Sequence, residues 1–520
     1  MHEKERGSSD DVSRVATLQA SVHANEDAHL TLWESFKKYR RAVMHCIFMT
    51  SAILLYGYDY VIIGTVTAMP SFQHDFGELL GGEWIFPSLW FGLWAFISPG
   101  LQMVGALLGG KFQDRFGRRA SLAMGSLLCA VGVAVCFVSN LPNDIDGRRG
   151  MFLAGKGIQG GAIGTVMVTA MTYMSEILPP NLRGPVLAFF PIFTLLGQLI
   201  GALVIFASMD RPDGYVLAFA SQWPFSALAL VAAIIIPESP TYLVRRNHEE
   251  QALKAQRRLG CIGGDPEQTL ERIRADIAHE RRLANATYQD SFRKPNRRRT
   301  FIIMFANTLP QLFGLTLLSK GSYFLQVVGL SPDMSVLILI IGVVCGLIAN
   351  ILSILALASF GRRPLILTTL SIAAVLWAST GIAGIFRGTV AAWYTAASLV
   401  AISVVCGLGA WPASQVVAAE TSALHLRGKA QGIGWFTSGA GYAVFGLVLP
   451  YMFNPDQGNL RGKTGFVFAG LCVLAAAVSF LYVPEMKGRT AAEIDRMFEQ
   501  KLSAREFAKW KNPNVPENGE

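Results

Sequence analysis

Charged residues are scarce in this sequence. Only 16% of its 520 residues are Asp, Glu, Lys or Arg, and 52% are hydrophobic, whereas soluble domains carry about 25% charged residues. The apolar residues also gather in long uncharged blocks. This pattern excludes an ordinary soluble globular protein and predicts a chain embedded in a membrane.

Motifs for catalysis, cofactors and metal ions are missing as well. The sequence contains no P-loop, no dinucleotide-binding fingerprint and no His and Cys group at metal-binding spacing. Six of the seven cysteines lie in apolar blocks, where they are ordinary packing residues, and Cys261 lies in a polar stretch. We therefore expect neither an enzyme nor a bound cofactor, metal ion or disulfide framework.

A cleavable signal peptide is also absent, because residues 1–41 contain no apolar core segment. The apolar blocks that follow have the length of a bilayer-spanning helix, roughly 20 residues. We expect an all-α membrane protein with twelve transmembrane helices, the first of which directs insertion. The predicted spans are 43–67, 85–110, 120–140, 151–175, 185–208, 217–237, 301–327, 335–358, 364–386, 391–419, 431–453 and 464–483.

Lys and Arg are unevenly distributed between the loops. If residues 1–42 are placed in the cytoplasm, the segments on that side carry 37 Lys and Arg, and the segments on the opposite side carry six. Such an excess marks cytoplasmic loops. We therefore expect both termini in the cytoplasm, and we attribute the net charge of +9 to this asymmetry and not to nucleic-acid binding.

An internal repeat is the most informative feature of the sequence. Phe-Gly-Arg-Arg occurs at 116–119 and again at 360–363, an offset of 244, and Glu176 recurs as Glu420 at the same offset. Duplicated halves related by an axis along the membrane normal are typical of alternating-access carriers, whose substrate site lies between the halves. An inert or channel-like bundle is the alternative interpretation.

The repeat and the polar stretches between spans predict five parts of the chain. Within the linker, Asp265 before Pro266 predicts a helix start ahead of 267–283. In the tail, a capping box at 490–493 predicts a helix over 491–508. The five parts are a cytoplasmic N-terminal segment (1–42), a first six-helix bundle (43–240), a cytoplasmic helical linker (241–300), a second six-helix bundle (301–484) and a cytoplasmic tail (485–520).

The loop between the second and third spans carries a charged motif. It reads Gly-Lys-Phe-Gln-Asp-Arg-Phe-Gly-Arg-Arg over 110–119 and resembles the signature of the major facilitator superfamily. Its acid and arginines can pair with each other and with neighbouring helix ends, which would close the cytoplasmic side in one state. In the second copy, Ala358 and Ser359 replace the Asp and Arg, so we expect a weaker latch there.

Three further motifs resemble those of the sugar porters within that superfamily. They are Glu176 with Arg183 seven residues later, Pro-Glu-Ser-Pro-Thr-Tyr-Leu at 237–243, and Pro-Glu-Met-Lys-Gly-Arg-Thr at 484–490. The resemblance implies a set of gating residues, although such ion pairs can also be plain surface anchors. The implied gating residues are Asp114, Arg115, Arg118, Arg119, Glu176, Arg183, Glu238, Arg362, Arg363, Glu420, Arg427, Glu485 and Arg489.

Other segments narrow the resemblance further. Gly-Tyr-Asp at 57–59, Tyr-Phe-Leu-Gln at 323–326 and Tyr-Met-Phe-Asn-Pro at 451–455 are similar to the fungal maltose and α-glucoside permeases. The likeness extends from about 43 to 510, almost the whole chain. It implies a carrier for an α-glucoside such as maltose, or for a hexose.

Two charges interrupt predicted spans of the first half, where a charge costs roughly 3 kcal/mol or more. These are Asp59 in the first span and Lys156 in the fourth. In proton-coupled sugar porters, the matching positions hold an aspartate and an arginine that pair. The resemblance therefore implies that Asp59 carries the proton and Lys156 is its counter-charge, with a static ion pair as the alternative. Lys320, in the seventh span, could extend outward to water, with a role in substrate binding as the alternative.

The family's substrate positions are only partly matched. Gln198 and Gln311 match glutamines that bind sugar in the family, whereas Pro191 and Pro310 stand where many hexose porters have Gln or Asn. Membrane-helix glutamines can also simply join helices. The implied substrate-binding residues are Gln198, Gln311, Thr316, Trp411, Gln415, Ser438 and Tyr442.

The sequence therefore predicts a monomeric proton–sugar symporter of the plasma membrane, surrounded by lipid and working by alternating access. One alternative keeps the fold and changes the cargo to a non-sugar metabolite, which could be exported. A second alternative is a sugar sensor that does not transport, although such sensors usually carry a longer signalling tail.

Overall fold

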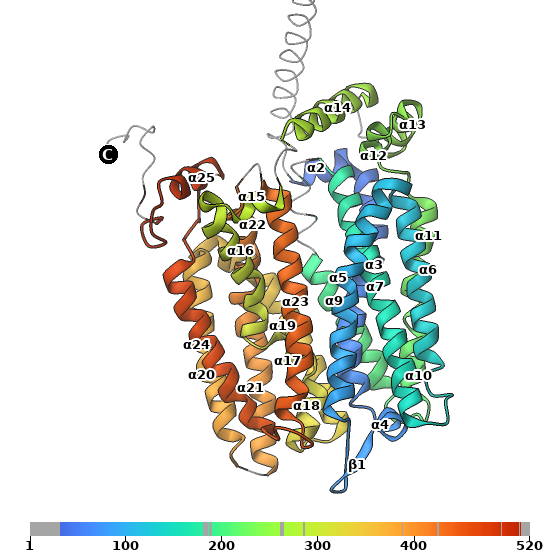
Figure 1. Cartoon of the computed structure of the whole chain (residues 1–520), viewed down its shortest axis with the longest axis vertical. Helices are drawn as coiled ribbons and strands as arrows, with labels where there is room; N and C mark the ends of the chain where they lie inside the picture. The colour runs from blue at the N-terminus through green and yellow to red at the C-terminus, as the bar shows by residue number, and fades with distance from the viewer. Residues whose placement is uncertain are drawn as a thin grey trace, which may run out of the picture.

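The computed structural model describes residues 32–510 except 180–181, 183–185, 187–189, 261–264, 284–286, 387, 424–425, 490 and 509. Its long helices form two bundles that lie side by side (Figure 1). The N-terminal bundle contains α3 (Arg40–Val66), α5 (Ser88–Phe116), α6 (Arg118–Phe137), α7 (Ile145–Ile177), α9 (Phe190–Ala207), α10 (Gly214–Ala220) and α11 (Trp223–Ile235). The C-terminal bundle contains α16 (Lys294–Leu312), α17 (Leu315–Ser319), α18 (Gly321–Val328), α19 (Pro332–Phe360), α20 (Arg362–Ala383), α21 (Thr389–Leu408), α22 (Ala410–Glu420), α23 (Arg427–Phe453) and α24 (Thr464–Tyr482).

The twelve predicted spans correspond to these helices. Within the described residues, ten helical segments are long and apolar enough to cross a membrane. The fourth predicted span is α7, which carries more charge than the others because it includes Lys156 and several charged residues near its start. The seventh is the broken run α16 to α18. The prediction of an all-α chain with twelve spans is therefore confirmed.

The break in the seventh span corrects the continuous helix predicted over 301–327. Gly314 adopts a φ of 96°, which is a left-handed conformation that ends α16 and starts α17. Pro310 lies inside the last turn of α16 and has no N–H for the helix ladder. The indole of Trp377 donates to the carbonyl of Phe313 at 2.9 Å, so a backbone group at the break is satisfied.

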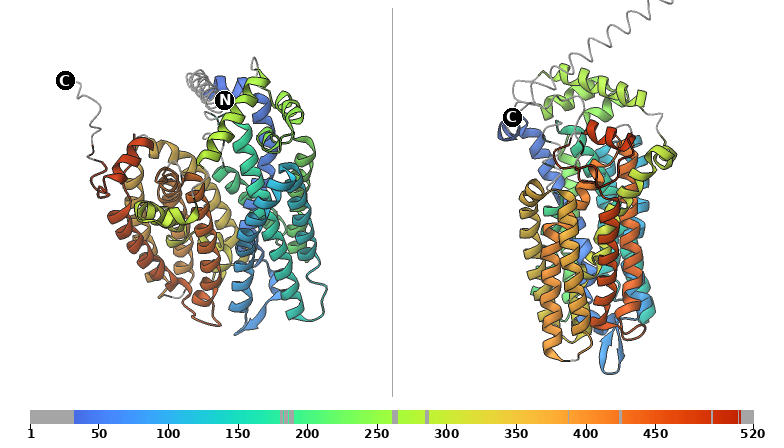
Figure 2. Two further views of the ribbon diagram at one scale, coloured as in Figure 1. Left: turned by 45° about the horizontal axis from the view of Figure 1, so that its top comes forward. Right: turned by 90° about the vertical axis from the view of Figure 1, so that its left-hand side faces the viewer.

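Short elements mark the two ends of the molecule. At one end, here named the linker end, lie α2 (Leu32–Lys38), α12 (Pro240–Arg245), α13 (Glu249–Leu259), α14 (Pro266–Leu283), α15 (Tyr288–Phe292) and α25 (Ala491–Glu499). At the other end, named the hairpin end, lie α4 (Pro70–Phe76) and the antiparallel strands β1 (Glu78–Leu80) and β2 (Glu83–Ile85). Figure 2 shows this hairpin projecting from the end opposite the linker helices.

The helices of the linker end attach to different bundles. Arg246, after α12, donates to the carbonyl of Asp114 at 2.9 Å, and Arg258 of α13 donates to that of Ile235 at 3.1 Å. Both acceptors belong to the first half of the chain. By contrast, the Thr300 hydroxyl of α16 donates to the carbonyl of Ser291 in α15 at 2.5 Å. The linker is therefore divided between the bundles.

Two predicted helices of the linker end have different outcomes. The α14 helix begins at Pro266, and the Asp265 carboxylate accepts from the Glu267 N–H at 3.0 Å, so the predicted start is confirmed. The tail helix was predicted over 491–508, and this is wrong, because α25 ends at Glu499. Lys501 takes a φ of 55°, and the Leu502 N–H returns to the carbonyl of Met497, which closes the helix end. Thr490 of the predicted capping box lies outside the described residues.

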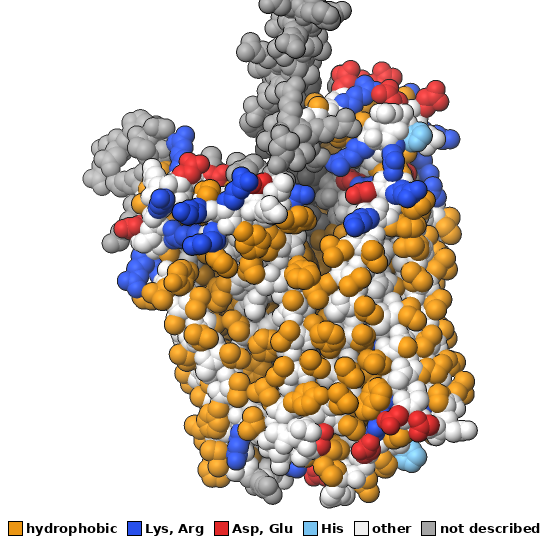
Figure 3. All heavy atoms as spheres, viewed as in Figure 1, with side chains coloured by type: hydrophobic (Ala, Val, Ile, Leu, Met, Phe, Trp, Pro, Cys, Tyr) orange, Lys and Arg blue, Asp and Glu red, His pale blue; other side chains and the backbone are white. Residues whose placement is uncertain are grey.

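The surface agrees with insertion in a bilayer. Hydrophobic side chains form a broad belt around the long helices, and Lys and Arg side chains gather at the linker end (Figure 3). Inside the N-terminal bundle, glycines let helices approach closely: a Cβ on Gly105 would lie 1.9 Å from the carbonyl oxygen of Gly161. Close contacts of this kind replace the hydrophobic effect as the source of helix association in lipid.

Candidate functional site

Asp59 and Lys156 form an ion pair inside the N-terminal bundle. Asp59 lies in α3 and Lys156 in α7, and both side chains are buried, with 7% and 1% of their surface exposed. The second carboxylate oxygen of Asp59 accepts a hydrogen bond from the Ser98 hydroxyl at 2.9 Å. The structure therefore brings together the two charges that the sequence singled out.

A chain of amides extends from this ion pair. Lys156 Nζ also donates to Gln159 Oε1 at 3.0 Å, and Gln159 Nε2 in turn donates to Gln222 Oε1. Every charged group of the network is thus paired, which is the condition for burying charge in a low-dielectric interior. The sequence analysis missed Ser98, Gln159 and Gln222, because lone Ser and Gln residues are common in membrane helices.

A cavity lies between the two bundles. One of the residues that line it is adjacent in sequence to Asp59 of the ion pair. Gln198 of α9 and Trp411 of α22 line it, as the sequence predicted for a substrate site. Tyr60 lines it as well, one residue after Asp59 in α3. The remaining wall is mostly apolar and includes Leu195, Phe313, Leu318, Ser319, Leu325, Ile338, Val343, Leu399 and Cys406.

The other predicted substrate residues are placed differently. The Thr316 hydroxyl donates to Gln311 Oε1, so these two buried side chains satisfy each other at the break of the seventh span. Tyr442 does not line the cavity, but its ring stacks on that of Tyr60 with the centroids 4.6 Å apart. This stack joins α23 to α3 across the two bundles.

Gln415 and Ser438 complete the predicted set. Gln415 lies one turn after Trp411 on α22, so it shares a helix face with a residue that lines the cavity, and Ser438 lies one turn before Tyr442 on α23, so it shares a face with the ring that stacks on Tyr60. Both side chains are partly buried. Neither is among the residues that line the cavity.

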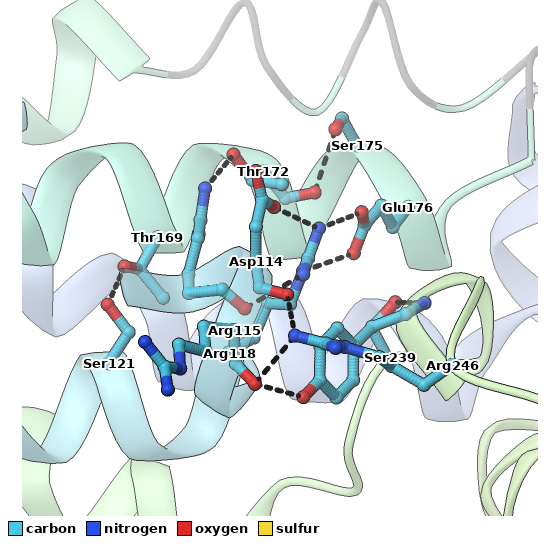
Figure 4. Close-up of polar contacts among 12 residues, drawn as sticks. Asp114, Arg115, Arg118, Ser121, Thr169, Thr172, Ser175, Glu176, Ser239 and Arg246 are labelled. Carbon is cyan, nitrogen blue, oxygen red and sulfur yellow. Dashed lines mark hydrogen bonds and ion pairs between the residues drawn. The ribbon is translucent and has the colours of Figure 1, made fainter. Parts of the chain in front are cut away.

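A first cluster of charges, here named the N clamp, lies at the linker end of the N-terminal bundle (Figure 4). Arg118, at the start of α6, binds both carboxylate oxygens of Glu176 in α7, at 2.9 and 2.6 Å. It also lies 3.5 Å from the Asp114 carboxylate and donates to the Gln113 carbonyl at 3.1 Å. Bidentate pairing of this kind is the strongest form of ion pair in proteins.

Glu238 holds the same helix start from the opposite side. Its carboxylate accepts the backbone N–H groups of Arg118 and Arg119 at 2.9 and 3.2 Å. A carboxylate at a helix N-terminus satisfies unpaired N–H groups and complements the helix dipole. The Arg119 side chain donates to the carbonyls of Ala233 and Ile234 near the end of α11, while the Arg115 carbonyl accepts from the Tyr242 hydroxyl at 3.0 Å.

The C-terminal bundle repeats the arrangement with fewer bonds; we name it the C clamp. Glu485 accepts the backbone N–H groups of Arg362 and Arg363 at 3.3 and 2.9 Å. Arg362 donates to Glu420 at 2.8 Å through one nitrogen only, and the buried Arg362 Nε and Glu420 Oε2 have no partner among the described residues. The two sequence repeats therefore form two corresponding clamps, and the C clamp makes fewer bonds between its arginine and its glutamate.

A glycine precedes each clamped helix. Gly117 has a φ of 96° and Gly361 a φ of 87°, both in the left-handed region. A Cβ at these positions would lie 2.5 Å from Glu238 Oε2 and 2.8 Å from Glu485 Oε2 respectively. Glycine is required here both for the backbone conformation and for the close approach of the carboxylate.

Three predicted gating residues are not part of the clamps. Arg183 lies outside the described residues. Arg427, at the start of α23, is exposed, and no carboxylate of the described chain lies within ion-pair distance of it. Arg489 donates to the carbonyl of Trp510 at 2.5 Å, so it holds the tail.

Lys320 is buried, which corrects the expectation that it extends outward to water. It lies between α17 and α18 with 2% of its surface exposed. Its amine donates to the Gly446 carbonyl at 3.4 Å and lies 5.4 Å from the centre of the Phe91 ring. Lys320 thus contacts α5 of one bundle and α23 of the other.

The two bundles are joined by hydrogen bonds at the hairpin end. Gln73 donates to Gln326 at 2.7 Å, and Ser322 donates to the Gly64 carbonyl at 2.8 Å. Several further hydrogen bonds and one ion pair join described residues of the two bundles at this end. They join Phe86 to Tyr323 and Asn454, Ser88 to Pro450 and Asp456, Ala68 to Gln326, and Glu83 to Arg461. The hairpin end is therefore closed.

Comparisons with known proteins agree with this architecture. The family described as "Sugar (and other) transporter" matches residues 43–498. The inward-open xylose transporter XylE from E. coli has the same fold, with a TM-score of 0.73 and 22% identity over 88% of this chain and 99% of that one.

Curated relatives match over most of their length. The MFS transporter fmqE of Aspergillus fumigatus is 30% identical over 95% of this chain and 94% of its own. The α-glucosides permease MPH3 of Saccharomyces cerevisiae is 28% identical over 97% of this chain and 85% of its own. These matches confirm a multi-pass membrane carrier and not an enzyme. The chain belongs to the sugar transporter family of the major facilitator superfamily.

Proposed function

We propose that this carrier is a proton–sugar symporter whose preferred substrate is an α-glucoside. The observation that carries the proposal is the buried pair of Asp59 and Lys156, one residue away from the cavity that Tyr60, Gln198 and Trp411 line. A protonatable carboxylate beside a substrate cavity is the arrangement that coupled transport requires. An amide and an indole suit a neutral sugar, because the amide exchanges hydrogen bonds with hydroxyls and the ring covers the C–H face.

The coupling follows from the contacts of Asp59. As a carboxylate, Asp59 accepts hydrogen bonds from Lys156 and Ser98. Protonation removes the negative charge and leaves the Lys156 ammonium without its partner, so the α3–α7 contact must rearrange. A proton that binds only when the cavity faces outward would in this way be tied to the movement of the sugar.

The orientation completes the proposal. We place the linker end in the cytoplasm, since the Lys and Arg side chains gather there (Figure 3). Both termini then face the cytoplasm, and the closed hairpin end faces outward. We further propose the plasma membrane as the location. A single chain contains both bundles and the cavity between them, so a monomer suffices for transport.

Uptake by the purified carrier in proteoliposomes tests the proposal. We expect labelled maltose or methyl α-glucoside to accumulate when a proton gradient directed inward is imposed, and to equilibrate without accumulation when the gradient is removed. Saturable but downhill transport under both conditions would contradict coupling. If the carrier transports neither glucosides nor hexoses, the proposal that its substrate is a sugar is contradicted.

A second candidate is a carrier for a non-sugar metabolite, working inward or outward. The mostly apolar wall of the cavity favours it, as do Pro191 and Pro310 at positions where hexose porters often have amides. This alternative would be supported if, in the same vesicles, the carrier transported none of the sugars but exchanged an apolar ring compound.

A further inference from the structure

Five aromatic rings form a chain that leads away from the cavity. Tyr60 stacks on Tyr442, and its centroid lies 6.2 Å from that of Tyr56. Tyr56 lies 5.9 Å from Phe190, which in turn meets Trp435 edge to face at 6.0 Å. The chain crosses from α3 and α9 in one bundle to α23 in the other.

Helical spacing places these rings on shared faces. Tyr56 and Tyr60 are four residues apart on α3, and Trp435 and Tyr442 are seven residues apart on α23. On α9, Phe190 is eight residues before Gln198, which lines the cavity. On α3 and α23, Tyr60 and Tyr442 are the rings nearer the cavity, and Tyr56 and Trp435 lie closer to the linker end. On α9, Gln198 lines the cavity and Phe190 lies closer to the linker end.

Trp435 is incompletely covered although it touches the other bundle. Its side chain is 53% exposed, while Phe190 meets it only at an edge. Seven residues of helix separate it from Tyr442 by about 10 Å. Trp435 therefore offers an exposed ring surface on α23, displaced toward the linker end from the Tyr60–Tyr442 pair. Ser438 lies on the same helix face between the two aromatic positions.

We propose that Tyr56, Phe190 and Trp435 form a second-ring subsite. It would bind the ring attached to the first glucose unit, by stacking against that ring's apolar face. The inference rests on the proposed function and deepens it, since it makes the carrier selective for two-ring glucosides over single sugars. The second ring can be a pyranose or an aromatic group, because both present the flat apolar face that an indole covers.

Three ligands test the subsite with the full-length carrier in proteoliposomes. Methyl α-glucoside has one ring, maltose adds a pyranose, and phenyl α-glucoside adds an aromatic ring. We expect Trp435→Ala to raise the apparent KM about tenfold for a two-ring ligand and to leave the KM for methyl α-glucoside unchanged. Trp435→Phe should restore most of the lost affinity.

Phe436→Ala is the matched control. Phe436 is the next residue of α23, is 55% exposed, and has no ring partner among the described residues. Its removal should change none of the three KM values. A KM change confined to maltose identifies a pyranose subsite, a change confined to phenyl α-glucoside identifies an aromatic subsite, and a change in both identifies a subsite for either ring.

Two outcomes would overturn the inference in distinguishable ways. Suppose that the wild-type carrier transports methyl α-glucoside, and that Trp435→Ala changes the KM values of all three ligands equally or changes none of them. The proposed subsite is then wrong, and the proposed sugar transport stands. If the folded wild-type carrier transports no glucoside at all, the proposed function is wrong and the subsite falls with it.

Discussion

Asp59 is the residue on which proton coupling would depend. In the Asp59→Asn variant, a neutral amide takes the place of the protonated acid and cannot release a proton. We expect uphill accumulation to fall to an inside-to-outside ratio of about 1, because no proton movement can then drive the sugar. Exchange of labelled for unlabelled sugar should persist.

Accumulation and exchange are measured in the same energised vesicles. Asp75→Asn is the control, since Asp75 lies at the hairpin end and pairs with Arg148 at 3.8 Å, away from the cavity. If Asp59→Asn still concentrates sugar, the proton is carried elsewhere.

Adding a single methyl group at position 117 tests whether this position requires glycine. In Gly117→Ala, the added Cβ meets Glu238 Oε2 at 2.5 Å while φ stays at 96°. Left-handed backbone alone costs a non-glycine residue about 1–2 kcal/mol, and we expect a clear drop in melting temperature. Gly110→Ala, whose Cβ meets nothing within 4 Å on α5, should leave the melting temperature unchanged or raise it. Equal shifts in melting temperature would show that position 117 does not require glycine.

The site residues that the sequence revealed are those whose chemistry conflicts with their surroundings. Asp59 and Lys156 are noticeable because charge in an apolar span is expensive. Tyr60 and Trp435 carry no such signal, since aromatic residues are ordinary in membrane helices. Their position at the cavity or between the bundles depends on the packing of distant helices, which one sequence does not encode in any short pattern.

Among the structural elements, hydropathy located the spans and missed the features that depend on local backbone geometry. The break at Gly314 is set by a left-handed residue within an apolar run, so apolarity alone predicts one helix. The hairpin turns at Gly81 and Gly82, both with positive φ, but its strands have three residues each. Such short strands give too little alternation to recognise.

The two clamps should contribute unequally to stability. Arg118 is 3% exposed and bidentate, and breaking a buried pair costs about 3–5 kcal/mol. Arg362 is 19% exposed and makes one bond to Glu420, so its pair should contribute about 1 kcal/mol or less. We therefore expect Arg118→Met to lower the melting temperature much more than Arg362→Met. Equal decreases in the melting temperatures of the two purified variants would show that the C clamp is not weaker for having fewer bonds.

At the scale of the whole molecule, alternating access as proposed here would require the hairpin end to open. Gln73 and Gln326 face each other across it at 2.7 Å. Replacing both with cysteine and cross-linking them should reduce uptake to background, and reduction of the cross-link should restore it. The control is a cysteine pair at Asp75 and Arg148, at the same end but within one bundle, which should transport normally when cross-linked. Uptake by a fully cross-linked Gln73–Gln326 variant would mean that the bundles do not separate there.

The divided linker has a consequence for how the molecule can be assembled. Because α12 and α13 are held by the first half of the chain and α15 by the second, a cut between Leu283 and Thr287 would leave each fragment with its own clamp. The surfaces that bring the fragments together would also be intact. Two separately translated fragments should therefore complement each other when they are produced in one cell. Covalent continuity between the halves would then serve to deliver them in equal number and not to hold the carrier together.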